Sequence, residues 1–298
     1  MYSVRTWWTE RRRQSRLPIR FHPLFFVLAL CAVGFGLWQE IVVLFLLVLL
    51  HELGHAAVAN HLGYEVEEVS LLPFGGVAKL SYGRMGPAPR HEALIAIAGP
   101  LVNLLLVAAA MGMSAAGLWG TPFTHTVIRL NLWIAIFNML PAMPLDGGRI
   151  LRAARSRTIG YEQATREAYR MAIVISLALL CLGGVALWAG FPHVGLLILG
   201  VFLFISAWTG RRDISMDTVR FLDAKRQAAG ARPEVIRSIA APADTTVRDV
   251  VKQFSPDRYH LVYVLDEQGG VRSILEEEEL LDAVFEGRWL ETLEAWLD

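Results

Sequence analysis

Six long apolar stretches divide the first 210 residues of this chain, and they constrain its fold more than any other feature. They run over roughly 21–38, 41–62, 93–118, 127–140, 171–189 and 194–208. A helix needs about 20 mostly apolar residues to cross the hydrocarbon core of a bilayer. Of the 298 residues, 54 % are hydrophobic and only 19 % are charged, which is too apolar for an ordinary soluble domain. The sequence therefore predicts a mainly α-helical, polytopic protein with a bundle of six transmembrane helices.

The distribution of charge predicts the orientation and the domain boundaries. Residues 1–20 contain six arginines, whereas the connections at 39–40, 119–126 and 190–193 contain no Lys or Arg. Because basic flanks stay on the cytoplasmic side, we expect a multi-pass protein of the cell membrane with both termini in the cytoplasm. The expected domains are a basic N-terminus (1–20), a membrane domain (21–210), a connector helix (211–232) and a soluble C-terminal domain (233–298).

Strand patterns occur in two places. The glycine-broken piece VSLLPFGGVAKL, residues 69–80, alternates apolar and small residues and predicts a short β-hairpin. In the C-terminal domain, alternation over 259–265, the turn DEQGG, a second short strand at 271–275 and an acidic helix from 276 predict a β-α-β-β-α module. The formal net charge is zero, so we do not expect a nucleic-acid partner.

The sequence HELGH, residues 51–55, follows directly on the apolar run at 41–50. On a helix of about 3.6 residues per turn, His51 and His55 lie one turn apart on one face, with Glu52 beside them. This is the pattern of a zinc site that carries its own general base. Ionisable groups at membrane depth are costly and generally mark function, so the motif predicts a catalytic zinc site.

A catalytic zinc ion takes three protein ligands and keeps a fourth position for water. His61 completes the spacing HExxHxxxxxH, but Val58 stands where the soluble enzymes of that spacing need glycine, and we interpret His61 as an interfacial residue. Asp146 is the better candidate, because Pro144 and a glycine pair frame it directly after an apolar stretch. The alternative for Asp146 is a helix-capping aspartate at the membrane surface.

Four segments together resemble the site-2 protease family of intramembrane zinc proteases: HELGH at 51–55, LLPFGG at 71–76, IAGPLVN at 97–103 and NMLPAMPLDGGR at 138–149. The resemblance extends over all six apolar stretches, and HPLF at 22–25 resembles the branch of the family that acts in sporulation. It implies that His51, His55 and Asp146 bind one Zn²⁺ per subunit. Glu52 is then the catalytic base.

The same resemblance implies where the substrate lies and what it is. Asn138 and Pro144 fall where the family lines its substrate channel, and Gly75 and Gly76 fall in a membrane-re-entrant segment that helps to place the substrate. The expected substrate is a membrane-associated protein in the lipid bilayer, and within the sporulation branch it is a sigma factor precursor. That branch implies a location in the mother-cell membrane around the forespore, with inhibitory membrane proteins as further partners.

The C-terminal domain resembles a single cystathionine-β-synthase-type (CBS) repeat. Such repeats work in pairs and bind adenine nucleotides such as ATP, so one copy implies pairing between subunits in a homo-oligomer. Glu276 and Glu279 stand where the family has residues that hold the ribose and phosphate. Two additional acidic groups should repel phosphate, which argues against ATP binding.

Two other functions are compatible with the sequence. A general site-2 protease would act on anti-sigma factors or signal-peptide remnants rather than on a sporulation precursor. A membrane metal transporter would also bind a metal ion between helices, but it would not require Glu52. Cleavage of a substrate by the wild type and by a Glu52 variant separates the protease from the transporter.

Overall fold

The computed structural model describes residues 19–21, 34, 36, 38–72, 75–81, 88–191, 193–228 and 235–296, without the side chains of the strands before residue 82. The chain divides into two compact units. One comprises 1–81 and 97–138, and the other comprises 82–96 and 139–298. The first expected span, at 21–38, lies almost entirely outside the described residues.

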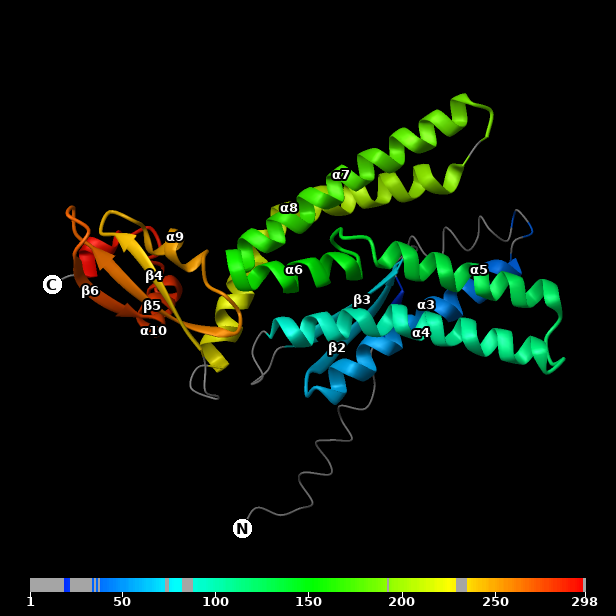
Figure 1. Ribbon diagram of the computed structural model, residues 1–298, viewed down its shortest axis with the longest axis horizontal. Helices are drawn as coiled ribbons and strands as arrows, with labels where there is room; N and C mark the ends of the chain where they lie inside the picture. Colours follow the sequence, from blue (N-terminus) through cyan, green and yellow to red (C-terminus); the bar gives the residue numbers. More distant parts are fainter. Residues whose placement is uncertain are drawn as a thin grey trace, which may run out of the picture. The chain divides into compact units, whose positions relative to one another are not determined.

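Four of the described helices are long and apolar enough to cross a membrane. They are α3 (Trp38–His61), α4 (Pro89–Ala115), α7 (Tyr161–Trp188) and α8 (Val194–Ala228), shown in Figure 1. The expectation of a mainly helical chain with several apolar helices is confirmed. The fourth expected span corresponds to the shorter helix α5 (Thr121–Asn138), and the number six stays a prediction.

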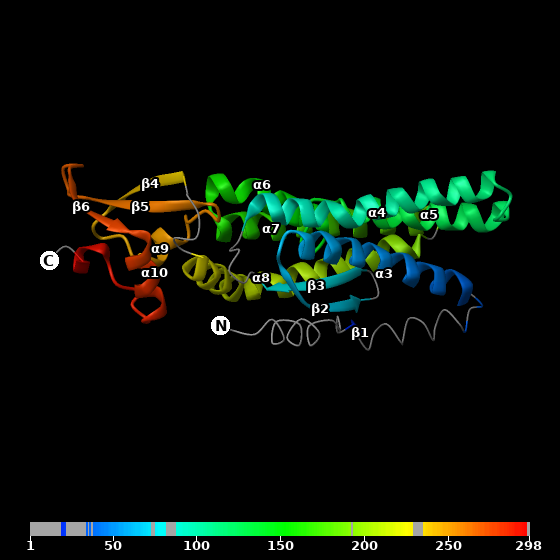
Figure 2. The ribbon, with the colours of Figure 1, turned by 90° about the horizontal axis from the view of Figure 1, so that it is seen from below.

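In the first unit, a small sheet accompanies α3. It consists of β1 (Ile19–Phe21), β2 (Glu65–Leu72) and β3 (Gly75–Ser81), in the order β1-β2-β3. β2 and β3 are antiparallel, so the hairpin expected here is present, and α3 runs along both strands (Figure 2). The parallel strand β1 was not predicted, because three residues at the edge of an apolar stretch carry no strand signal of their own.

The apolar core of the first unit lies between α3, α4 and α5, and it comprises Leu47, Val48, Ala110, Val127 and Ile134. α3 ends at His61 because Gly63 adopts a φ of +88°, which glycine reaches without steric cost. The last turn of α3 is therefore fixed, and the chain turns directly into β2.

In the second unit, α7 and α8 form a helical hairpin. Their close approach depends on two glycines, because a Cβ at Gly183 would lie 2.6 Å from Leu197 and a Cβ at Gly200 would lie 2.9 Å from Leu180. α8 continues without a break, so the sixth expected span and the connector helix are one helix. The basic segment between the fourth and fifth apolar stretches forms helix α6 (Asp146–Ile159) and the start of α7.

The C-terminal domain has the predicted order β-α-β-β-α: β4 (Val235–Pro242), α9 (Val247–Val251), β5 (Arg258–Leu265), β6 (Val271–Glu276) and α10 (Glu277–Phe285). Its sheet has the order β4-β5-β6, with β4 and β5 parallel. One face of the sheet packs on α9 and α10, as Figure 1 shows, and forms a core of buried aliphatic and aromatic side chains. A short 3₁₀ helix, Leu293–Trp296, follows. The assignment to the CBS type stays a prediction.

The C-terminal domain is hydrogen-bonded to the end of α6 and the start of α7. The backbone N–H of Tyr161 donates to the carbonyl of Phe254 at 3.1 Å, and the Arg237 guanidinium donates to the carbonyl of Thr158 at 3.0 Å. Tyr161 also stacks on Phe221 of α8, with ring centroids 4.4 Å apart, inside the core of the C-terminal domain. The domain therefore shares one core with the ends of two long helices.

A buried ionic cluster joins α8 to the C-terminal domain. Lys225 forms an ion pair with Glu277, and the same carboxylate accepts a hydrogen bond from Nδ1 of His260 at 2.6 Å. Nε2 of His260 accepts from the backbone N–H of Ser255 at 3.1 Å. Because a backbone N–H can only donate, His260 is held neutral with its proton on Nδ1.

This cluster predicts a loss of stability in mild acid. Burial lowers the pKa of His260 below its ordinary value of 6.5, although Glu277 acts in the opposite direction. An unfolded chain therefore takes up a proton at a pH where the folded chain does not, and the stability of the domain falls as the pH drops below about 6.5. We expect amide protection in β5, measured by hydrogen exchange and corrected for intrinsic rates, to be lower at pH 5.5 than at pH 7.5. In His260→Gln the difference should shrink; parallel profiles would contradict the assignment.

Candidate metal site

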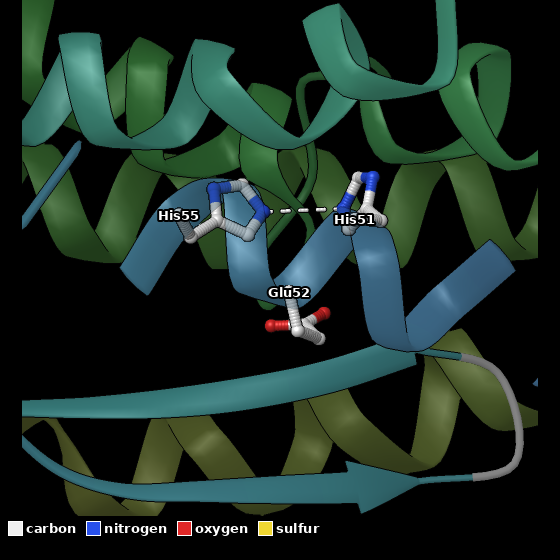
Figure 3. Close-up of side chains that lie close together, drawn as sticks. All are labelled: His51, Glu52 and His55. Carbon is white, nitrogen blue, oxygen red and sulfur yellow. Dashed lines mark hydrogen bonds between the residues drawn. The ribbon is translucent and has the colours of Figure 1, made fainter. Parts of the chain in front are cut away.

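Helix α3 brings three buried, metal-ligating side chains together in the middle of the first unit. The ligand atoms of His51, Glu52 and His55 all lie within 4.8 Å of one another, and each residue is at most 3 % exposed. Figure 3 shows the two imidazole rings on one side of α3, with Nε2 of His51 facing Nε2 of His55 at 3.1 Å. The helical spacing predicted from HELGH is therefore realised in the structure.

The geometry of this pair suits zinc. With Zn–N bonds of 2.0–2.1 Å, two ligands of a tetrahedral ion are about 3.3 Å apart, close to the 3.1 Å between the two Nε2 atoms. The rings are nearly perpendicular, at 86°, so their edges and not their faces converge. The donor set of two imidazoles and a nearby carboxylate is the one that zinc prefers.

A glycine on α4 permits the histidines to occupy this position. A Cβ on Gly99 would lie 2.6 Å from Cε1 of His51 and 2.5 Å from Cε1 of His55. One turn away along α3, a Cβ on Gly54 would lie 2.7 Å from Val102 of α4. Glycine at these two positions therefore lets α3 and α4 lie close together beside the histidines.

Two buried asparagines connect His51 to the neighbouring helices. Oδ1 of Asn103 on α4 lies 2.5 Å from Nδ1 of His51, and Nδ2 of Asn103 donates to Oδ1 of Asn131 on α5 at 2.9 Å. Nδ2 of Asn131 in turn donates to the backbone carbonyl of Val127 at 2.9 Å. Both asparagines are completely buried. These contacts connect three helices and end at Nδ1 of His51, whereas Nε2 of the same ring faces His55. We call Asn103 and Asn131 with these bonds the asparagine row.

Asp146 is the first residue of α6 in the second unit, and it is 6 % exposed. The glycine pair after it, Gly147 and Gly148, lies inside the first turn of α6. A Cβ on Gly147 would meet the carbonyls of Met139 and Leu140, and one on Gly148 would meet the backbone of Ala142. The sharp return of the chain before Asp146 therefore requires both glycines. Coordination by Asp146 stays a prediction.

The remaining site residues predicted from the sequence lie in several elements. Asn138 is the last residue of α5, half-buried, and its side-chain amide donates to the carbonyl of Ile134 at 3.0 Å. Pro144 is exposed in the turn before α6. Gly75 and Gly76 begin β3 and pair with the end of β2. His61 is exposed at the end of α3, as the interfacial interpretation expects.

Sequence reasoning assigned no role to Asn131, and it included Asn103 only as the last residue of the segment IAGPLVN. The signal available was an amide in an otherwise apolar helix, which needs a partner from a neighbouring helix. Which partner it meets depends on how the helices cross, and this is not encoded in spacing along one helix.

In the C-terminal domain, the carboxylates of Glu276 and Glu279 both accept hydrogen bonds at the start of α10. The Glu279 carboxylate accepts from the backbone N–H of Glu276 at 3.0 Å, and the Glu276 carboxylate accepts from the Tyr259 hydroxyl at 3.2 Å. Burial, together with Glu276, raises the pKa of Tyr259 to about 12. Both acidic side chains thus act at the start of α10, where they oppose the approach of a phosphate.

The family model of peptidase family M50 matches residues 39–129 and 112–182 of this chain, which include HELGH and Asp146. The chain is 32 % identical to a zinc metalloprotease of Methanocaldococcus jannaschii over 68 % of its own length. It is also 29 % identical to the stage IV sporulation protein FB of Bacillus subtilis, covering 90 % of this chain and 92 % of that protein.

Among solved structures, the site-2 protease from Methanocaldococcus jannaschii has a TM-score of 0.55 and 32 % identity, covering 66 % of this chain and 91 % of that one. The chain spans 60 % of the length of the archaeal zinc metalloprotease. The residues that the family model matches contain the histidine pair and the two asparagines behind it.

Proposed function

Because this chain belongs to peptidase family M50, we propose that it is an intramembrane zinc endopeptidase. The observation that carries the proposal is the convergence of the two Nε2 atoms of His51 and His55 at 3.1 Å, with the Glu52 carboxylate beside them, inside a helix apolar enough to cross a membrane. A buried cluster of this kind is expensive to maintain in an apolar helix unless it binds an ion.

His51 and His55 would hold one zinc ion through Nε2. The third ligand in this proposal is the Asp146 carboxylate, supported by its burial at the start of α6 and by its place in the motif PLDGG. Zinc bound here supplies Lewis acidity, which makes both a water molecule and a peptide carbonyl more reactive near neutral pH.

Glu52 is the general base. One of its carboxylate oxygens lies within 4.8 Å of a ring nitrogen of each histidine, a separation that one water molecule can bridge. The carboxylate takes a proton from the attacking water and later delivers one to the leaving amine nitrogen. Its burial at 3 % exposure keeps bulk water away from this proton transfer.

The proposed substrate is a membrane-associated protein that reaches the site from within the bilayer. A peptide bond in a transmembrane helix is shielded by its own hydrogen bonds, so the substrate must unwind near the cut, where glycine or proline assists. Asn138, Pro144, Gly75 and Gly76 are proposed to line its path. Similarity to stage IV sporulation protein FB over 92 % of that protein supports a sigma factor precursor as the substrate and the mother-cell membrane around the forespore as the location.

The expected topology, oligomeric state and partners belong to the same proposal. Basic flanks support cytoplasmic termini. Six spans, pairing of two C-terminal domains in a homo-oligomer and inhibitory membrane partners are consistent with it. We propose no ATP function for the C-terminal domain, because the acidic groups at the start of α10 disfavour phosphate.

Zinc content tests the ligand set. We expect the purified full-length protein in detergent to hold one zinc per chain, and Asp146→Ala to lose it on dialysis against a weak chelator, because two imidazoles alone bind zinc weakly. The exposed residue Asp213 on α8 provides the control Asp213→Ala, which should keep its zinc. If Asp146→Ala retained one tightly bound zinc and lost only stability, Asp146 would be a helix-capping residue and not a ligand.

A further inference from the structure

The far end of the asparagine row determines the direction of every hydrogen bond in it. The carbonyl of Val127 can only accept, so the side-chain group of Asn131 that faces it is the NH₂ group. Oδ1 of Asn131 is then directed at Asn103, which must present its own NH₂ group. Oδ1 of Asn103 is left facing Nδ1 of His51. Reversing Asn131 would lose both of its bonds, and reversing Asn103 would lose its bond to Asn131.

This direction fixes the protonation of His51. An amide oxygen can only accept, so Nδ1 of His51 must carry the hydrogen, and the lone pair of the ring lies on Nε2. Nε2 is the nitrogen that faces His55. His51, Asn103 and Asn131 are at most 2 % exposed, so water does not compete for these groups.

We propose that Asn103 and Asn131 are positioning residues for zinc, which together hold His51 in the Nδ1–H tautomer and at the ring angle needed for coordination through Nε2. The inference rests on the proposed function, because it concerns the same metal site. Asn131 acts without touching the histidine: it orients the Asn103 amide, and the amide orients the ring. Loss of a hydrogen-bonding partner behind a metal-binding histidine typically weakens metal binding about 10- to 100-fold.

A purely structural role makes different predictions. Asparagines that hydrogen-bond across helices also hold membrane helices together. If that were their only contribution, replacing them would lower the unfolding midpoint and leave the affinity and geometry of the bound metal unchanged in the protein that remains folded. Metal affinity and metal geometry therefore have to be measured separately from stability.

The test uses full-length protein in detergent, stripped of metal, with Zn²⁺ affinity measured by chelator competition and geometry by the d–d absorption of bound Co²⁺. The variants are Asn131→Leu, Asn103→Leu and Asn103→Asp. The matched control is Thr124→Val, because Thr124 is also buried on α5 and donates to a backbone carbonyl in the preceding turn, at 3.1 Å.

We expect both leucine variants to bind Zn²⁺ about 10- to 100-fold more weakly and to change the Co²⁺ spectrum. Asn103→Asp keeps an oxygen acceptor for Nδ1–H but cannot donate to Asn131, so its affinity should fall less than that of Asn103→Leu. Thr124→Val should match the wild type in both measurements. Wild-type affinity and spectrum in Asn131→Leu would overturn the proposal, and so would a loss in Asn103→Asp as large as in Asn103→Leu.

A second measurement does not depend on any asparagine variant folding. In wild-type protein labelled with ¹⁵N-histidine, the proposal requires a slowly exchanging proton on Nδ1 of His51, assigned by its disappearance in His51→Ala. A His51 ring protonated on Nε2 in the metal-free protein would overturn it. Failure of the wild type to bind zinc or cleave a substrate would instead count against the proposed function. Wild-type zinc binding and cleavage with an unaffected Asn131→Leu would count against the positioning role alone.

Discussion

Replacing Glu52 with glutamine should abolish proteolysis while leaving the zinc in place. Glutamine keeps the size and burial of the side chain but cannot accept the proton of the attacking water, so we expect cleavage to fall by a factor of roughly 10² to 10⁴. The measurement is cleavage of a co-expressed membrane-associated precursor, compared with zinc content of the same preparation. Such a separation of activity from metal content is specific to a general base.

The comparison with Asp146→Ala makes this result interpretable. The ligand variant should lose zinc and activity together, whereas Glu52→Gln should lose activity alone. If Glu52→Gln cleaved the precursor at the wild-type rate, Glu52 would not be the base. A metal transporter would show zinc binding in both the wild type and Glu52→Gln, and cleavage in neither.

Replacing Gly99 with alanine should disrupt the site from the neighbouring helix. The new Cβ would lie 2.5–2.6 Å from ring carbons of both histidines, so α4 must retreat from α3 or the rings must rotate. Overpacking of this kind costs about 1–3 kcal/mol of stability. Because the rings carry the metal-facing nitrogens, we also expect zinc affinity to fall at least about tenfold. Chelator competition and thermal unfolding in detergent measure the two effects.

Gly112 on the same helix supplies the matched control for Gly99. A Cβ at Gly112 would meet no atom of the described residues within 4 Å, and alanine is favoured over glycine in a helix by about 1 kcal/mol. Gly112→Ala should therefore leave zinc affinity unchanged and stabilise the protein slightly. The opposite signs of the two stability changes separate steric exclusion at the site from helix propensity. Equal zinc affinity in both variants would contradict the role assigned to Gly99.

Local sequence patterns were sufficient for most of the secondary structure. Hydrophobic runs marked the long helices, alternation broken by glycine marked the β2–β3 hairpin, and strand and turn signals gave the order of the C-terminal domain. Helix α6 was not among the predicted elements, because its first turn contains two glycines and its body is rich in arginine. Packing of the glycines against the preceding turn, which no local pattern reports, overrides their low helix propensity.

The sequence by itself determined the histidine pair of the candidate metal site, because the distance between His51 and His55 is set by one turn of a single helix. The contacts between residues of different helices were decided only by the tertiary structure. Gly99 meets the histidines, and Asn103 meets both His51 and Asn131, because three apolar helices cross at this one depth. The spacing of residues along a helix fixes their angle around its axis. The spacing carries no information about which neighbouring helix a residue will face. The neighbour depends on how all the helices pack.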